Sequence, residues 1–147
     1  MFKSLLKTDN DYSATVLRLL LGIVMFGHGG QKMLGWFGGG GFQGTMQGMS
    51  EALGIPAFLV FLVIVTEFFG SIALIIGFLG RIAALGVGVI MVVAVLKIHG
   101  HNGFFMNWYG AQPGEGFEYH LLVIAIVVAL LIKGSGALSV DKALSGE

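Results

Sequence analysis

The stretch ATVLRLLLGIVMFGHGGQKMLGWFGGGGF (Ala14–Phe42) decides the fold, because it joins a long apolar run to a polar end and a series of glycines. Its first part, Ala14–Met25, is almost wholly apolar apart from Arg18. A helix that crosses a bilayer needs roughly 17–25 predominantly apolar residues. We therefore predict a membrane-spanning helix whose far end carries polar groups, followed by a flexible turn.

The composition supports a membrane environment for the rest of the chain. Of 147 residues, 56% are hydrophobic and 11% are charged, with a mean hydropathy of +0.90. Soluble domains carry about 25% charged residues, so these charges are too few to cover a surface and lipid must cover part of it. The formal net charge of zero gives no indication of a nucleic-acid partner. The absence of cysteine excludes a disulfide relay or a thiolate metal site within the chain.

Four segments are predicted to span, at residues 13–34, 56–79, 81–99 and 118–133. We expect an all-α integral membrane four-helix bundle, with residues 1–147 forming a single four-span domain. The fourth segment is short at its polar end. A signal peptide is the rival interpretation of the first segment, but Arg18 within the apolar run and the lack of a cleavage pattern favour a retained helix.

Basic residues predict the orientation of the spans. An even number of spans places both termini on one side of the membrane. Most basic residues fall on that side, namely Lys3, Lys7, Arg81, Lys133 and Lys142, with Arg18 close to it. The positive-inside rule therefore predicts that both termini are cytoplasmic.

The two outer loops differ in character. The first begins with a flexible hinge at Gly38–Gly41, after which apolar residues recur at i, i+4, i+7 and i+11 from Phe42 to Leu53. This spacing predicts a short amphipathic helix lying on the membrane surface. The second outer loop, Gly100–Phe117, is rich in aromatic residues, and Trp108 fits an interfacial belt.

Each predicted helix brings ionisable groups to one layer in the outer half of the bundle. At about 1.5 Å per residue from assumed inner boundaries, His28, Glu67, Lys97, Glu118 and His120 lie about 20–24 Å from the inner side. Together with Lys32, which shares a helix face with His28, they are the candidate residues of this layer. An unpaired charge in hydrocarbon costs roughly 2.5–3.5 kcal/mol, so the groups should pair. The layer is either a ligand site or a set of ion pairs that locks the bundle.

Other charged and histidine residues are given structural or solvated roles. Arg18 and Arg81 lie nearer the inner face, where snorkelling or simple pairing is expected. Helical spacing places Arg18, His28 and Lys32 in one sector of the first helix, and we expect that face to point into the bundle. His99-x-His101 is a weak metal pair, so no metal site is assigned. Haem would need two facing histidines at one depth, and His28 and His120 are candidates for such a pair, but nothing else in the sequence supports haem binding.

Several motifs make the sequence similar to the DoxX family of small membrane proteins. They are LRLLLGIVMFGHGGQKM (Leu17–Met33), LGIP (Leu53–Pro56), EFFGSIALIIGFLGR (Glu67–Arg81) and GFE (Gly116–Glu118). The resemblance implies a four-helix bundle in the bacterial cytoplasmic membrane. Some members resemble or form the membrane subunit of a thiosulfate:quinone oxidoreductase, and others are linked to oxidative or quinone stress. The positions that match the family pattern are Arg18, Lys32, Glu67, Arg81 and Glu118.

Three functional classes follow. The first is a redox-associated protein that binds a quinone or small reductant, either as an enzyme or as a non-catalytic subunit of a quinone-linked oxidoreductase. The second is a permeation protein for small solutes, and the third is a structural anchor for a partner enzyme. The expected partners are the lipid bilayer, a redox protein and a second copy of the chain. Quinone is the first-ranked ligand, ahead of haem or a metal.

Overall fold

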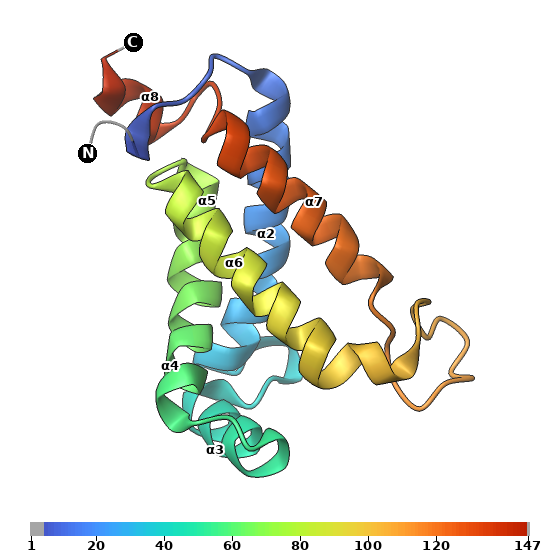
Figure 1. Cartoon of the computed structure of the whole chain (residues 1–147). Coiled ribbons are helices and arrows are strands. Elements are labelled where there is room, and N and C mark those ends of the chain that lie inside the picture. The colour runs from blue at the N-terminus through green and yellow to red at the C-terminus, as the bar shows by residue number, and fades with distance from the viewer. Residues whose placement is uncertain (1–4, 147) are drawn as a thin grey trace.

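The protein is built from helices that pack side by side (Figure 1). The computed structural model describes residues 5–146, and no strand occurs within that range. Four long helical segments form the bundle: α2 (Tyr12–Leu34), α4–η2–α5 (Ala57–Val65, Thr66–Gly70 and Ser71–Ile76), α6–η3–η4 (Gly80–Ala94, Val95–His99 and Gly100–Asn102) and α7 (Glu118–Lys133). Packing runs from α2 to α5, α5 to α6, α6 to α7 and back to α2.

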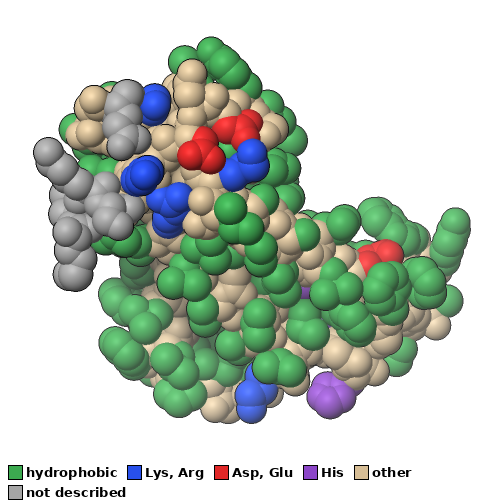
Figure 2. All heavy atoms as spheres, turned by 45° about the horizontal axis from the view of Figure 1, so that its top comes forward, with side chains coloured by type: hydrophobic (Ala, Val, Ile, Leu, Met, Phe, Trp, Pro, Cys, Tyr) green, Lys and Arg blue, Asp and Glu red, His purple; other side chains and the backbone are tan. Residues whose placement is uncertain are grey.

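The bundle has two distinct ends. The segments that adjoin both termini meet at one of them, which we call the terminal end (Figure 1). The opposite end, here the loop end, carries the short helix η1 (Trp36–Gly38), α3 (Gly41–Leu53) and the loop of residues 103–117. Charged side chains gather at the terminal end, whereas hydrophobic side chains cover the flanks (Figure 2). Such a distribution suits a bundle surrounded by lipid.

Local signals in the sequence explain where α2 begins and ends. The Asp11 carboxylate accepts hydrogen bonds from the backbone amides of Ser13 and Ala14, which caps the first turn. The helix ends at Leu34 because Gly35 adopts a left-handed conformation with φ of 76°. The predicted span 13–34 therefore matches the observed helix closely.

The hairpin between the second and third spans is longer than the sequence predicted. Its second span was expected to continue to Leu79, with Gly80 alone as the connection. Instead α5 ends at Ile76, because Gly77 takes a left-handed φ of 70° and turns the chain. The third segment begins at Gly80 and continues as helix to Asn102, beyond the predicted end at His99.

Three helical segments within the described residues are long and apolar enough to cross a membrane. They are Tyr12–Leu34, Ala57–Ile76 and Gly80–Asn102. The fourth segment, α7, has 16 residues and is the short one, as predicted. The all-α integral membrane four-helix bundle is confirmed. The amphipathic helix expected in the first loop is also present as α3, which packs against α2 and α4.

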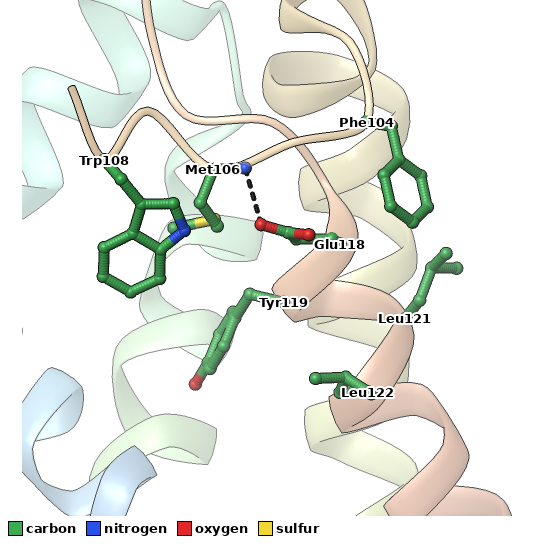
Figure 3. Close-up of a pocket in the computed structure, with 7 residues that line it drawn as sticks. All are labelled: Phe104, Met106, Trp108, Glu118, Tyr119, Leu121 and Leu122. Atoms are coloured by element: carbon green, nitrogen blue, oxygen red, sulfur yellow. Dashed lines mark hydrogen bonds between the residues drawn. The ribbon is translucent and has the colours of Figure 1, made fainter. Parts of the chain in front are cut away.

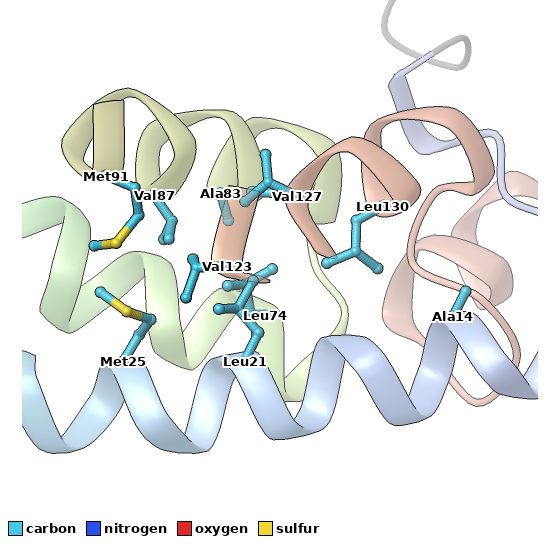
Figure 4. Packing of buried hydrophobic residues seen from close by; sticks show 11 residues of the cluster. Ala14, Leu21, Met25, Leu74, Ala83, Val87, Met91, Val123, Val127 and Leu130 are labelled. Atoms are coloured by element: carbon cyan, nitrogen blue, oxygen red, sulfur yellow. The ribbon is translucent and has the colours of Figure 1, made fainter. Parts of the chain in front are cut away.

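A hydrophobic core separates the two ends of the bundle. Leu21 and Met25 of α2 face Leu74 of α5, Val87 and Met91 of α6, and Val123 and Val127 of α7, together with Ala14, Ala83, Ala84 and Leu130. Figure 4 shows these side chains pointing toward one another between the helices. The last described helix, α8 (Val140–Ser145), lies beyond the core at the terminal end (Figure 1).

Candidate functional site

The terminal end is closed by a buried hydrogen-bond network around Arg18. The Arg18 side chain, 1% exposed, donates to the carbonyls of Leu74 at 2.7 Å, Ile75 at 2.5 Å and Ser135 at 2.8 Å. The first two carbonyls belong to the last turn of α5, where a positive charge is favourable. Of the two expectations for Arg18, the structure shows pairing rather than snorkelling, with backbone carbonyls as the partners.

Asp141 completes this network and was missed by the sequence analysis. Its carboxylate accepts the backbone amides of Leu79 at 2.7 Å and Gly80 at 3.0 Å, at the start of α6. The Ser135 hydroxyl donates to the same carboxylate at 2.5 Å. The Ser139-Val-Asp141 pattern could have indicated a helix start, but nothing local indicates a contact 61 residues away.

Arg81 has a comparable role at the end of α7. Its guanidinium donates to the carbonyls of Leu131 and Ile132, each at 2.9 Å, and also to the Lys7 carbonyl. The side chain therefore caps the C-terminal turn of α7 from the neighbouring helix. Both arginines assigned as structural charges make contacts that hold helix ends together.

The loop end contains a different polar group centred on Glu67. Glu67 is 3% exposed and its carboxylate forms an ion pair with the Lys32 amine, with an Nζ–Oε2 distance of 2.5 Å. The carboxylate lies on η2, a π-helical turn, and such turns occur frequently at functional sites. Gly29 lets α2 approach this turn, since a Cβ there would lie 2.6 Å from the Glu67 carbonyl oxygen.

Two side chains at the start of α7 carry buried polar atoms at the same end of the bundle. The Tyr119 hydroxyl is buried without a hydrogen-bond partner among the described residues. His120 is 6% exposed, and within the same part of the chain its Nδ1 atom also has no partner. Buried polar atoms usually find partners, so these two orphaned atoms call for an explanation.

The histidines are arranged differently from the expectation. His99, on the π-helical turn η3, packs its ring against His120 with centroids 4.2 Å apart. The His28 side chain is exposed rather than turned into the bundle. His28 sits one residue before Gly29, where α2 is pressed against η2, so it lies at the edge of that contact. We name His28, Lys32, Glu67, His99, Tyr119 and His120 the loop-end cluster.

Two of the predicted layer residues lie outside this cluster. Lys97 is exposed on η3, with no ion pair among residues 5–146. Glu118 is turned toward the loop, where its Oε1 atom accepts the Met106 amide at 2.8 Å (Figure 3). The structure thus brings together four of the six predicted residues and adds His99 and Tyr119. Tyr119 had no signal beyond its position beside His120.

A pocket lies next to the cluster, between the loop of residues 103–117 and the first turns of α7. Its volume is about 460 Å³, and its wall consists of Phe104, Met106, Trp108, Glu118, Tyr119, Leu121 and Leu122 (Figure 3). Tyr119 contributes its ring to the pocket, while its hydroxyl lies away from the Glu118 carboxylate.

The donor set does not fit a haem held by paired histidines. His99 and His120 are in ring contact, which leaves no room for a porphyrin iron between them. The other expected pair, His28 and His120, does not face across a space, because His28 is exposed. No group of three or more metal-ligating side chains is assembled within residues 5–146.

Together these features define a small helical membrane protein with a buried polar cluster near one end of its bundle. The family profile of DoxX matches residues 13–100, which include α2 through η3 and therefore both partners of the Lys32–Glu67 ion pair. The chain belongs to the DoxX family.

Two curated relatives cover most of the chain. Inner membrane protein YqjF of Escherichia coli (strain K12) is 33% identical over 141 residues, which cover 95% of this chain and 98% of the relative. The protein of Bacillus subtilis (strain 168) named "Putative oxidoreductase CatD" is 27% identical over 131 residues, covering 89% and 86%. No solved structure matches the chain.

Proposed function

We propose that the protein is a redox-associated membrane protein whose loop-end cluster binds a quinone. The observations that carry the proposal are the buried Lys32–Glu67 ion pair and two orphaned polar atoms at the same end of the bundle, Tyr119 Oη and His120 Nδ1. The oxidoreductase name of the Bacillus relative supports a redox association. The inner membrane location of the Escherichia relative supports a multi-pass protein of the bacterial cytoplasmic membrane.

The chemistry of the cluster suits a quinone carbonyl. The Tyr119 hydroxyl and a protonated His120 nitrogen are donors for such an oxygen, and histidine can exchange a proton near neutral pH. Reduction of a quinone to a quinol takes up two electrons and two protons. The chain has no cysteine, so the electrons come from a partner redox protein in this proposal. The chain then acts as a quinone-binding subunit rather than as the complete enzyme.

The packing argues against permeation as the function. A solute path would have to connect the loop-end cluster with the polar network around Arg18. Apolar side chains, among them Leu21, Met25 and Leu74, fill the bundle between these two levels (Figure 4). A structural anchor would use the same ion pair but would give no reason for two orphaned polar atoms. The expected homo-oligomer stays a prediction.

Quinone binding by the purified protein in nanodiscs tests the proposal. Glu67→Gln removes the counter-ion of Lys32, which disturbs the cluster while keeping side-chain volume. We expect the dissociation constant of decylubiquinone to rise about tenfold, equivalent to one hydrogen bond to a charged group. Glu51→Gln is the matched control, because Glu51 is exposed on α3 and contacts only Gln47 among the described residues.

Three results would contradict the proposal. The proposal is excluded if the wild-type protein neither binds the quinone nor changes the quinone-linked turnover of a co-purified partner. Equal loss of binding in Glu67→Gln and Glu51→Gln places the ligand elsewhere. If the protein conducts solutes across liposome membranes and Glu67→Gln abolishes this flux, the permeation class is favoured instead.

A further inference from the structure

The loop-end pocket is preformed by hydrogen bonds within the loop that covers it. The backbone amides of Gly116, Phe117 and Glu118 donate to the carbonyls of residues 105, 103 and 104 at 3.2, 3.2 and 2.9 Å. The side chain of Asn107 both donates to and accepts from the backbone of Gln112. These bonds hold the aromatic residues of the loop against α7, so a ligand would not have to order the loop itself.

The pocket opens on the flank of α7 rather than into the bundle. Leu121 and Leu122 form its floor and are exposed, whereas Val123 on the same helix is buried in the core. The sequence predicts α7 as the fourth span, and in that arrangement this flank faces lipid. A molecule dissolved in the bilayer would reach the pocket directly from the membrane.

The walls favour a planar ring over a flexible acyl chain. Phe104, Trp108 and Tyr119 supply three aromatic surfaces, and Met106 supplies a polarisable sulfur. Aromatic side chains bind flat rings by stacked or edge-to-face contacts, and sulfur also packs well against ring edges. The volume of about 460 Å³ lies within the range of small-molecule sites, roughly 300–1,000 Å³.

Glu118 adds one polar requirement to this apolar site. Its Oε1 atom is occupied by the Met106 amide, while its Oε2 atom has no hydrogen bond within the described part of the chain. An ionised carboxylate only accepts hydrogen bonds. The free oxygen therefore selects a ligand that carries a hydroxyl group and disfavours one that presents only carbonyl or ether oxygens.

We propose that the pocket formed by Phe104, Met106, Trp108, Glu118, Tyr119, Leu121 and Leu122 binds a lipid-soluble hydroxylated aromatic ring, whose hydroxyl donates to Glu118. This site shares Tyr119 with the loop-end cluster, but none of its other lining residues belongs to that cluster. The inference does not depend on quinone binding at Glu67. It also gives Glu118 a role that differs from the shared polar layer predicted by the sequence.

Tryptophan fluorescence tests the site with a ligand that takes no part in redox chemistry. The chain contains two tryptophans, so Trp36→Phe leaves Trp108 in the pocket wall as the sole reporter. The probe is 3-bromo-4-hexylphenol, whose bromine quenches tryptophan on contact, compared with its O-methyl ether, which cannot donate a hydrogen bond. We expect saturable quenching by the phenol and about tenfold weaker binding of the ether.

Three variants in the Trp36→Phe background locate the ligand. Leu122→Phe fills the pocket and should abolish saturable quenching, whereas Ile132→Phe, on an exposed position farther along α7, should leave it intact. Glu118→Gln can still accept the Met106 amide, so the loop should stay in place. It should weaken phenol binding and remove the difference between phenol and ether.

Each alternative result is decisive. Quenching could rise linearly with the concentration of the probe in the membrane, and equally in a Trp108→Phe variant that reports from Trp36. This result would show that the probe only partitions into lipid, and it would overturn the site. Equal affinities of phenol and ether in the Trp36→Phe protein would overturn recognition by Glu118. If the wild-type protein binds no quinone but still shows saturable quenching by the phenol, the proposed function is refuted and this site stands.

Discussion

Arg18 and Asp141 stabilise the two helix ends that meet at one hairpin, and each does so with the charge that its helix end prefers. Arg18 donates to the carbonyls that end α5, and the carboxylate of Asp141 accepts the amides that begin α6. Helix C-termini favour positive charge and N-termini favour negative charge. The C-terminal segment is thereby joined to the transmembrane hairpin, 61–62 residues earlier in the chain.

Replacing Asp141 by asparagine should destabilise the protein. Asparagine keeps one acceptor oxygen, but in either orientation its amide nitrogen would face a backbone N–H, that of Leu79 or that of Gly80, and this buried donor would lose its partner. We expect a loss of about 2 kcal/mol, which would appear as a lower melting temperature in detergent. Asp9→Asn, at an exposed position, is the control and should melt like the wild type. Equal melting of the two variants would show that the cap contributes little.

Gly29 should tolerate no side chain, because α2 touches the η2 turn there. A Cβ at Gly29 would lie 2.6 Å from the Glu67 carbonyl oxygen, so Gly29→Ala must push the two helices apart at a cost of about 1–3 kcal/mol. Gly27→Ala is a matched control on the same helix, since nothing lies within 4 Å of its added Cβ. It should preserve or raise the melting temperature by improving helix propensity. A stable Gly29→Ala protein would contradict the close approach.

The sequence predicted the bundle, because apolar runs of membrane length determine the spans. It also predicted that the charged groups of the layer would pair, and Lys32 and Glu67 do so. The individual partners could not be assigned, because regular 3.6-residue spacing does not hold throughout the helices. The wider π-helical turn at Val95–His99 changes which residues face the bundle, so His99 contacts His120 while Lys97 is exposed.

Tertiary contacts account for the other differences. Glu118 was assigned to the polar layer from its depth alone, but it caps the loop through the Met106 amide instead. No periodicity in the sequence encodes the path of a loop. In the same way, Asp141 could not be connected to the α5–α6 hairpin, because its partners are backbone amides, which leave no residue-specific signal.

Acidification should weaken the contact between Asp11 and Lys133. Their ion pair, aided by hydrogen bonds from Ser13, holds the pKa of Asp11 well below its ordinary value of about 3.9. The unfolded state therefore takes up a proton first, and stability present above about pH 4 is lost as the pH falls further. Asp11→Asn keeps the helix cap but removes the charge, so its stability should depend less on pH between 5 and 3. Identical pH profiles for the two proteins would exclude this contribution.

Single cysteines should test the orientation of the bundle, because the chain has none of its own. Asn10 and Ala111 are exposed at the terminal end and in the long loop, respectively. If the positive-inside prediction holds, a membrane-impermeant maleimide should label Ala111→Cys in intact cells and Asn10→Cys only after lysis. The reverse pattern would invert the topology, and labelling of both in intact cells would exclude four spans.

Tyr119→Phe should separate a functional role from a structural one. The Tyr119 hydroxyl is buried and has no hydrogen-bond partner within residues 5–146, so its removal deletes a desolvated polar atom and should not lower the melting temperature. If the hydroxyl donates to a bound quinone, the same change should weaken binding of decylubiquinone by about tenfold.

Tyr12→Phe is the matched control, because Tyr12 is exposed at the start of α2, far along the helix from Lys32. It should alter neither the melting temperature nor quinone binding. Unchanged or higher stability together with weaker binding is characteristic of a residue kept for its ligand. If Tyr119→Phe instead melts lower and binds the quinone normally, the hydroxyl contributes to packing and the proposed contact is wrong.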